Sequence, residues 1–572
     1  MNYISISIVV MGLFVSCTRS QIADTILING KVITVDNNFS LVEAIAIKGD
    51  KIIAVGTNSE IEKYSNAGTK VIDVKGKAVI PGIIDAHCHP EDASISELEG
   101  EIPDVHKIQE LLVWIKSQAS SKKKGEWIVF PSMFYTRLGD MRQPLLAELD
   151  QAAPNNPVFL DGSYGGMINT SAMKASGITE ETIHEGLVRD EKSGKLTGLI
   201  KYAAFKLLKR PPAQKLTYDD EVSALQNMFK EYNKMGITGI ISGYHTFANF
   251  ERYQDMAAKH QLTLRVSQNF RLPYNIRDSK DRLVDSLKTL NIVTEQGDEW
   301  VRTGSLKIFL DGGILTGTAY LREPWGKKAS AVYGIHDHSY KGVINYTRDE
   351  LLNIVWAANE LNWAFTAHCT GGGGVDLLLD VFEEVDKIKP IADRRFSIIH
   401  GNFYTDEAIQ RMQKLGILAN CQAAWFYKDA DAMKYILGDE RIKVFNPFGS
   451  LVKAGVMVSG GSDHMEKMDP NASINPYNPF LAMWSMITRT TERGNIVEPL
   501  EAISRIDALK MYTINNAFAT FEENIKGSLE TGKLADLVIL SQNILDCPEN
   551  EIKNIHSELT MVGGKVVYLK GE

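Results

Sequence analysis

Two histidines follow an apolar segment near the start of the chain. The segment runs from Ile80 through a Pro-Gly pair to Asp85, and His87 and His89 come directly after it. Side chains two residues apart on an extended chain point to the same side, so both imidazoles can reach one metal ion. Two solvated loop histidines are the alternative. The position of the pair after an apolar strand favours the metal site.

Three further apolar segments end in a residue type that binds metals. They end at His368, at His400 and, after two glycines and a serine, at Asp463. A lone histidine at a strand end is more often structural. Here two such histidines occur in the same chain as an aspartate at a strand end and the earlier histidine pair. Because imidazole and carboxylate both suit divalent ions, this combination predicts one shared metal centre.

A lysine interrupts another apolar segment, between Leu306 and Ile308. A buried ammonium group is costly unless it is paired or neutral. Lys307 therefore has two interpretations. Its ammonium pairs with a nearby acid, or its amine reacts with CO2 to give a carbamate that can bridge two metal ions.

Strand-like apolar segments alternate with helical patterns between residues 79 and 524. The segments are Ala78–Ile84, Pro157–Leu160, Ile237–Ile241, Leu264–Ser267, Leu306–Leu310, Ala364–Ala367, Phe396–Ile399, Ile417–Ala419 and Val456–Ser459. This alternation predicts an α/β fold with a parallel sheet closed into a TIM-like (β/α)8 barrel. Catalytic groups of such barrels lie at the carboxyl ends of the strands, where the candidate metal ligands occur.

Short strands and turns mark both ends of the chain. Residues 22–78 and 525–572 alternate apolar strands with Asn-Gly, Gly-Asp and Gly-Gly turns. Chain termini often lie close together. We therefore expect one small β-sandwich domain built from both termini, with the barrel spanning residues 79–524.

The first 17 residues differ from the rest. Ile4–Val15 is apolar and carries no charge, but it is shorter than the ~20 residues that cross a bilayer as a helix. It is typical of a signal peptide, and Phe14-Val15-Ser16 before Cys17 is similar to a bacterial lipobox. We expect Cys17 to be lipidated and the exported protein to be anchored to a bacterial membrane, facing the periplasm. An ordinary cleaved signal or a buried strand is the alternative.

The ordered segments taken together resemble the amidohydrolase superfamily, and in particular the amidohydrolase-3 group that includes N-substituted formamide deformylases. The similar segments are PGIIDAHCH (81–89), GITGIIS (236–242), LKIFLDGGILTGTAYLREPWG (306–326), FTAHCTGGG (365–373), FSIIHGN (396–402), GGSDH (460–464) and the stretch from 508 to 540. They cover nearly the whole chain after residue 22.

The resemblance implies a role for each candidate ligand. His87, His89 and Asp463 would hold the more buried ion, and carbamylated Lys307 would bridge to a second ion. His368 and His400 would hold that second ion. The implied cofactor is zinc or another divalent metal, with one or two ions per chain. A metal-bound hydroxide would attack the substrate, and Asp463 would be the catalytic residue that accepts and returns the proton.

The chain departs from the family pattern around the pocket. No acid directly follows His368, Tyr164 stands where the family has a histidine, and Ile399 rather than a glutamate precedes His400. These changes spare the ligands but alter the expected pocket wall. Candidate pocket residues are Tyr164, His245, His464 and Arg322, the last of which is equally suited to pairing with an acid.

The function predicted from these residues is hydrolysis of a C–N bond in a small amide, formamide or cyclic amide. Ester or lactone hydrolysis at the same centre is one alternative, and a lipoprotein that binds a small molecule on a degenerate barrel is another. The net charge of −9 argues against nucleic-acid binding. The only expected membrane contact is the lipid anchor. The oligomeric state is open, with a homodimer as one option.

Overall fold

The computed structural model describes the chain except for residues 1–20, 99, 101, 163–164, 191, 212–214, 273–276, 336 and 572. The predicted signal peptide with Cys17 and the pocket candidate Tyr164 thus lie outside the described residues. No helix in the described part is both long and apolar enough to cross a membrane.

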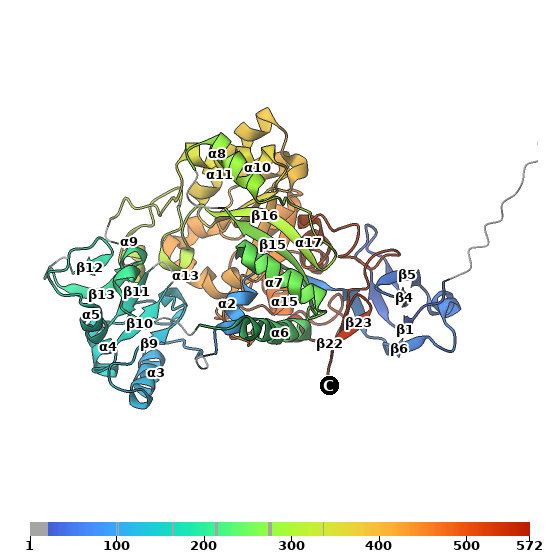
Figure 1. Cartoon of the computed structure of the whole chain (residues 1–572), viewed down its shortest axis with the longest axis horizontal. Coiled ribbons are helices and arrows are strands. Elements are labelled where there is room, and N and C mark those ends of the chain that lie inside the picture. The colour runs from blue at the N-terminus through green and yellow to red at the C-terminus, as the bar shows by residue number, and fades with distance from the viewer. Residues whose placement is uncertain are drawn as a thin grey trace, which may run out of the picture.

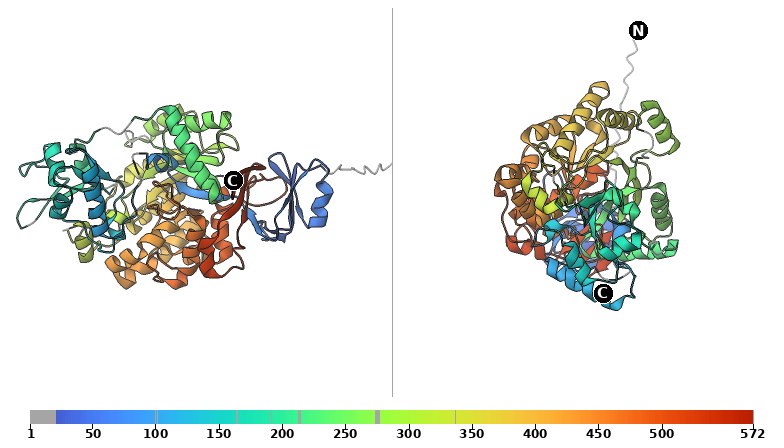
Figure 2. Two further views of the ribbon diagram at one scale, coloured as in Figure 1. Left: turned by 90° about the horizontal axis from the view of Figure 1, so that it is seen from below. Right: turned by 90° about the vertical axis from the view of Figure 1, so that its left-hand side faces the viewer.

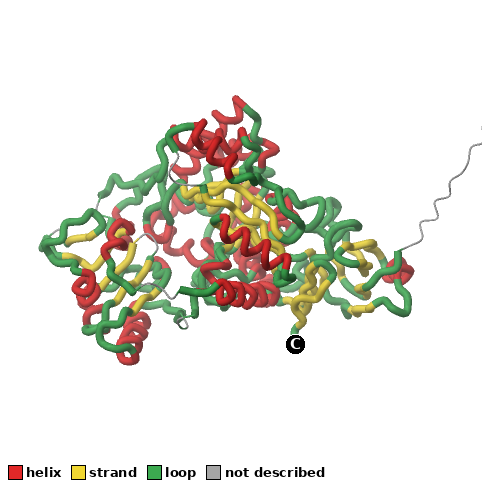
Figure 3. Tube along the Cα trace, viewed as in Figure 1, coloured by secondary structure: helices red, strands yellow, loops and turns green. Residues whose placement is uncertain are grey.

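Eight parallel strands form the central sheet, in the order β20-β19-β18-β17-β16-β15-β14-β8. They are β8 (Ile83–Cys88), β14 (Ile237–His245), β15 (Arg265–Arg271), β16 (Val301–Phe309), β17 (Phe365–Cys369), β18 (Ser397–His400), β19 (Leu418–Gln422) and β20 (Val458–Gly461). The sheet curls into a nearly closed barrel, seen as the yellow strands at the centre of Figure 3. The predicted α/β barrel is confirmed.

Amphipathic helices cover the outside of the barrel (Figure 1). They include α6 (Tyr218–Lys234), α7 (Phe247–Ala258), α8 (Lys280–Thr289), α10 (Arg348–Glu360), α11 (Gly372–Ile388), α12 (Asp406–Leu415) and α13 (Ala423–Arg441). In α12 the buried residues Ala408, Met412 and Leu415 recur at helical spacing, and Thr405 caps the first turn by accepting the Ala408 N–H. Burial of such apolar faces holds the helices on the sheet.

The barrel closes between β8 and β20 through hydrogen bonds that lie beyond a regular ladder. Past the end of β20, the Asp463 amide donates to the His87 carbonyl at 2.6 Å, and the His89 amide donates to the His464 carbonyl at 2.7 Å. At the other end of the seam, Asn516 donates to the carbonyls of Ile84 at 2.6 Å and Gly460 at 2.8 Å. Closure therefore joins the segments that carry the candidate ligands.

Two of the strand predictions need correction. The run Ala78–Ile84 divides at Gly82, so that β7 (Ala78–Pro81) belongs to a terminal sheet and only β8 enters the barrel. A Cβ on Gly82 would lie 2.1 Å from Oγ1 of Thr238, which explains the glycine at this close approach. Pro157–Leu160 does contribute a strand, β10 (Val158–Asp161), but this strand lies outside the barrel.

Strand β10 belongs to an insertion between β8 and β14, which we define as residues 102–211. Its five-stranded sheet has the order β12-β13-β11-β10-β9 and is flanked by α3 (Ile108–Ser121), α4 (Leu146–Ala152) and α5 (Thr170–Ser176). The other strands are β9 (Ile128–Phe130), β11 (Gly165–Ile168), β12 (Leu187–Arg189) and β13 (Leu196–Lys201). The insertion has its own apolar core and lies at the opposite end of the molecule from the terminal strands (Figures 1 and 2).

The terminal segments form two separate sheets. The first has the order β5-β4-β1-β6, and the second has the order β23-β22-β21-β7-β2-β3. The first contains β1 (Thr25–Ile28), β4 (Ala44–Lys48), β5 (Lys51–Gly56) and β6 (Lys70–Asp73); the second contains β2 (Lys31–Ile33), β3 (Leu41–Val42), β7, β21 (Leu537–Leu540), β22 (Ser557–Val562) and β23 (Lys565–Leu569). A shared core that includes Leu27, Ile45, Val79 and Leu537 packs them together.

Candidate metal centre

The candidate ligands converge at the carboxyl ends of the barrel strands. Oδ1 of Asp463 lies 3.3 Å from Nε2 of His87 and 3.4 Å from Nε2 of His89. Nζ of Lys307 lies 3.1 Å from Nε2 of His87. Leu306 and Ile308 belong to the main apolar core, and alternation along β16 turns Lys307 to the other face of the strand, toward His87.

The remaining two histidines complete the cluster. The ring centroid of His400 lies 4.6 Å from that of His368 and 5.6 Å from that of His87. His87, His400 and Asp463 can each offer one ligand atom, and these three atoms lie within 4.8 Å of one another. The structure thus brings together all six residues that the sequence nominates as ligands.

The protonation states in this cluster suit a metal ion. Burial, with the charge of Lys307, lowers the pKa of His87 well below its usual value, and burial lowers the pKa of His400 to about 4. Both imidazoles are therefore neutral at pH 7 and keep a lone pair for a metal. Burial disfavours the charged form of Asp463, but the hydrogen bond with His89 and nearby positive charge outweigh it and lower the pKa of Asp463.

The donor set fits a divalent ion. Nε2 of His87 faces Oδ1 of Asp463 at 3.3 Å, and Nδ1 on the other side of the ring is buried without a hydrogen-bond partner within the described residues. Neutral imidazoles and one carboxylate are the donor set that zinc and similar divalent ions prefer.

The orientation of His400 is set by an amide chain. Nδ1 of His400 lies 2.7 Å from Oε1 of Gln422, whose Nε2 donates to Oδ1 of Asn420 at 2.8 Å. Because the Gln422 amide nitrogen donates to Asn420, its oxygen faces the histidine and accepts a hydrogen bond from Nδ1–H. Nε2 of His400 therefore carries the lone pair, an arrangement that is common among metal-binding histidines.

Two of the candidate ligands occupy an unusual backbone conformation. His400 has φ of 75° and Asp463 has φ of 58°, both in the left-handed region. Such conformations cost about 1–3 kcal/mol each in non-glycine residues and concentrate at functional sites. Here the two strained residues are those whose side chains face the cluster at the ends of their strands.

An acid from the neighbouring strand lies beside His368. Asp311 follows β16 and accepts the backbone N–H groups of Thr370 at 2.8 Å and Gly371 at 2.7 Å. Its Oδ1 lies 3.8 Å from Nε2 of His368, and burial raises the pKa of Asp311 to about 7. Although no acid follows His368 directly in the sequence, the fold supplies one from β16.

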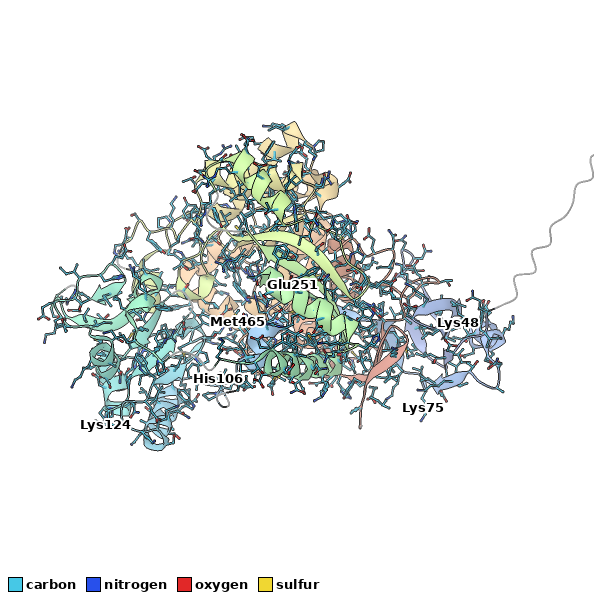
Figure 4. The ribbon with its side chains drawn as sticks, in the orientation of Figure 1. Lys48, Lys75, His106, Lys124, Glu251 and Met465 are labelled. Carbon is cyan, nitrogen blue, oxygen red and sulfur yellow. The ribbon has the colours of Figure 1, made fainter. Side chains whose placement is uncertain are left out.

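The cluster forms one side of a cavity of about 1360 Å³. Near the ligands the wall is aromatic, since Trp425 stacks on His400 with centroids 4.3 Å apart and Phe309 lies 4.8 Å from His368. Residues of the insertion, among them Tyr135 and Leu199, line the far side. Met465, labelled in Figure 4, also lines this cavity between the two parts.

The residues predicted to line the pocket lie in different places in the structure. His464 is fully buried and does not line the cavity: its Nδ1 lies 2.8 Å from the Tyr232 hydroxyl, and its Nε2 meets the Glu466 and Lys467 carbonyls. Arg322 pairs bidentately with Asp376 at 2.6 and 2.7 Å, also away from the cavity lining. His245 ends β14, and its side chain lies outside the described residues.

Several residues of the site carry no strong sequence signal. Gln422, Asn420 and Asn475 are polar residues in ordinary surroundings, and their contacts depend on the fold. Gly243 does have a sequence signal, because a glycine within a strand marks a close approach of other atoms. A Cβ at this position would lie 2.6 Å from Cε1 of His89 and 2.7 Å from Cε1 of His87, so the glycine makes room for both rings.

We predict that Gly243→Ala displaces one or both rings and weakens zinc binding about 10- to 100-fold, the range for changes that misorient ligands. Competition with a chromogenic chelator measures this. Gly239→Ala on the same strand is the matched control, because its Cβ would meet no atom closer than 3.5 Å. Equal zinc affinity in the two variants would contradict the packing argument.

Comparison with known proteins agrees with this geometry. The chain is 30% identical over 564 residues to N-substituted formamide deformylase of Arthrobacter pascens, covering 96% of this chain and 99% of that protein. It is 28% identical over 562 residues to the protein LONG AFTER FAR-RED 3 of Arabidopsis thaliana, covering 96% of this chain and 92% of that protein.

Solved structures share the fold. An uncharacterised metal-dependent hydrolase from Pyrococcus horikoshii superposes with a TM-score of 0.66 at 22% identity, covering 92% of this chain and 99% of that one. A similar hydrolase from Pyrococcus furiosus gives a TM-score of 0.64 at 22% identity, covering 91% of this chain and 100% of that one. The model of the amidohydrolase family matches residues 70–568, and the chain therefore belongs to the amidohydrolase family.

Proposed function

We propose that this hydrolase cleaves the C–N bond of a small amide, and in particular of an N-substituted formamide, at a centre of one or two divalent metal ions. The observation that carries the proposal is the convergence of His87, His400 and Asp463, with Lys307 against them, at the wall of a large cavity. The whole-length similarity to a formamide deformylase favours this substrate class over esters or lactones.

The ligand set assigns a task to each side chain. His87, His89 and Asp463 would hold one ion, and His368 and His400 a second, with Lys307 between them. A bound divalent ion such as zinc supplies Lewis acidity that lowers the pKa of water and polarises a carbonyl. The lowered pKa of Asp463 keeps its carboxylate charged near pH 7, so that Oδ1 or Oδ2 can accept a proton from water and return it to the leaving nitrogen.

The cavity constrains the substrate. Its volume of about 1360 Å³ exceeds the roughly 300–1,000 Å³ typical of small-molecule sites, so it has space for a sizeable substituent on nitrogen. Trp425 and Phe309 make the wall beside the cluster aromatic. We therefore expect formamides and amides with apolar nitrogen substituents to be preferred over charged ones.

The N-terminal pattern supports a location for this activity. A signal peptide ending at a lipidated Cys17 would place the enzyme outside the cytoplasmic membrane, facing the periplasm. The two-segment β domain, which includes β7, would flank the barrel that begins at β8.

The direct test is release of free amine from a panel of N-alkyl and N-aryl formamides. We expect hydrolysis that is abolished by a chelator and restored by zinc, and that falls at least ~10³-fold in Asp463→Asn, because the residue loses a proton acceptor and a charged ligand. Asp281→Asn, at an exposed position on α8, is the control. Hydrolysis that survives both chelation and Asp463→Asn would refute the proposal.

A second prediction concerns Lys307. Burial lowers the pKa of Lys307 to about 7, so its amine is protonated at pH 6 and mostly neutral at pH 8. Only the neutral amine can bond to the carbon of CO2, and the reaction releases one proton. At fixed dissolved CO2, the neutral amine is roughly tenfold more abundant at pH 8 than at pH 6, and because carbamate formation also releases a proton, we expect the carbamate to rise by more than that factor. Carbon-13 NMR with labelled CO2 measures it.

Lys307→Met provides the control for this signal. The variant should lack the carbamate resonance at both pH values and should retain less metal than the unmodified chain. An identical resonance in Lys307→Met would assign the carbamate elsewhere. No resonance in either protein would favour the unmodified ammonium, held beside Asp463.

A further inference from the structure

We infer that Arg137 and Asn475 form a positioning relay that holds Asp463 in place, so that docking of the insertion controls the candidate metal centre. The inference rests on the proposed function, because it assigns a purpose to residues behind the Asp463 carboxylate. Both residues act through Asp463 and are positioning residues.

The inner member of the relay contacts Asp463 directly. Nδ2 of Asn475 donates to the backbone carbonyl of Asp463 at 2.7 Å and lies 3.4 Å from its Oδ2. The Asp463 amide already donates to the His87 carbonyl at 2.6 Å. Asn475 therefore secures the other backbone group of a residue in the left-handed region, and Asn475 is itself buried.

The outer member determines which way the Asn475 amide points. Nη2 of Arg137 lies 3.2 Å from Oδ1 of Asn475, and Nη1 donates to the Ile474 carbonyl. A guanidinium group has donors and no acceptor, so the amide oxygen must face Arg137. The amide nitrogen then faces Asp463. Without Arg137, the asparagine could rotate and present its oxygen to the Asp463 carbonyl.

A buried acid keeps Arg137 in this position. Asp429 on α13 accepts from Nε and Nη2 of Arg137, both at 2.8 Å, and its side chain is fully buried. Bidentate pairs of this kind fix the plane of the guanidinium group. The geometry of the relay is therefore rigid from Asp429 to Asp463.

The relay crosses a boundary between parts of the molecule. Arg137 lies in η2 (Tyr135–Arg137) of the insertion, whereas Asp429 and Asn475 follow barrel strands. Phe134 and Tyr135, which precede Arg137 by three and two residues, line the large cavity. The same short segment thus forms part of the cavity wall and orients the amide behind Asp463.

The consequence concerns the distances at the centre. The Asp463 carboxylate lies within 3.3 and 3.4 Å of His87 and His89 only while its backbone keeps the observed conformation. Loss of the Asn475 contact would let this backbone relax. A rotated carboxylate would be a poorer ligand and a poorer proton acceptor, and the change in the cavity wall would be confined to the Asn475 side chain, which lines it.

The test compares Asn475→Ala, Arg137→Lys and the double variant in the full chain. Arg137→Lys keeps the charge beside Asp429 but cannot also reach Asn475. Asn471→Ala, at an exposed position of the same loop, is the matched control. The readouts are the rate of zinc release to a chelator, kcat and KM for a hydrolysed formamide, and the thermal unfolding midpoint.

We expect Asn475→Ala to release zinc about 10- to 100-fold faster and to lower kcat by a similar factor, with KM within about threefold. Arg137→Lys should shift both quantities in the same direction by less. The double variant should match Asn475→Ala, because Arg137 acts through Asn475. Asn471→Ala should behave like the unmodified chain.

Three results would overturn the relay. These are an Asn475→Ala variant with unchanged zinc release and kcat, effects of the two substitutions that multiply in the double variant, and no zinc binding in the unmodified chain. Zinc release needs no substrate. A chain that holds zinc but hydrolyses no amide would therefore refute the proposed function while still testing the relay.

Discussion

The hydrogen bond from the Asp463 amide to the His87 carbonyl, at 2.6 Å, joins the last barrel strand to the first. No regular ladder spans this seam within the described residues, and closure depends on such individual bonds and on Asn516 at the other end. Asp85 contributes as well, because its Oδ1 accepts the amides of His87 and Ser462, both at 3.0 Å. Barrel closure and the assembly of the candidate site thus depend on the same hydrogen bonds.

The burial that closes the barrel also determines the chemistry. Charged groups are costly in such surroundings, so the pKa values of His87, His368 and His400 are lowered and the pKa of Lys307 falls to about 7. The carboxylate of Asp463 stays charged because donors and positive charge surround it. A divalent ion held by the imidazoles and the Asp463 carboxylate would compensate the buried negative charge. Through Asn475 and Arg137, the insertion also contacts the segment that carries Asp463.

The features that depend on local sequence pattern could be predicted, namely the alternating strands and helices and the ligands that follow the strands. Ligands at strand ends were identifiable because the carboxyl ends of parallel strands meet, and all six came together. The pattern could not say which sheet an apolar run joins, so Pro157–Leu160 was assigned to the barrel and the insertion was missed. The pattern also could not place His464, and for Arg322 it left open the pairing with an acid that the structure shows. Their partners, Tyr232 and Asp376, lie 232 and 54 residues away in the chain.

Anomalous diffraction at the zinc edge, from crystals grown with zinc, tests whether the buried cluster holds a metal. We expect a peak within bonding distance of His87 and Asp463, with a second peak near His368 and His400 if two ions bind. A map with zinc only at surface sites, and with the six side chains arranged as they are here, would contradict this expectation. The buried cluster would then be a structural network that holds the barrel closed.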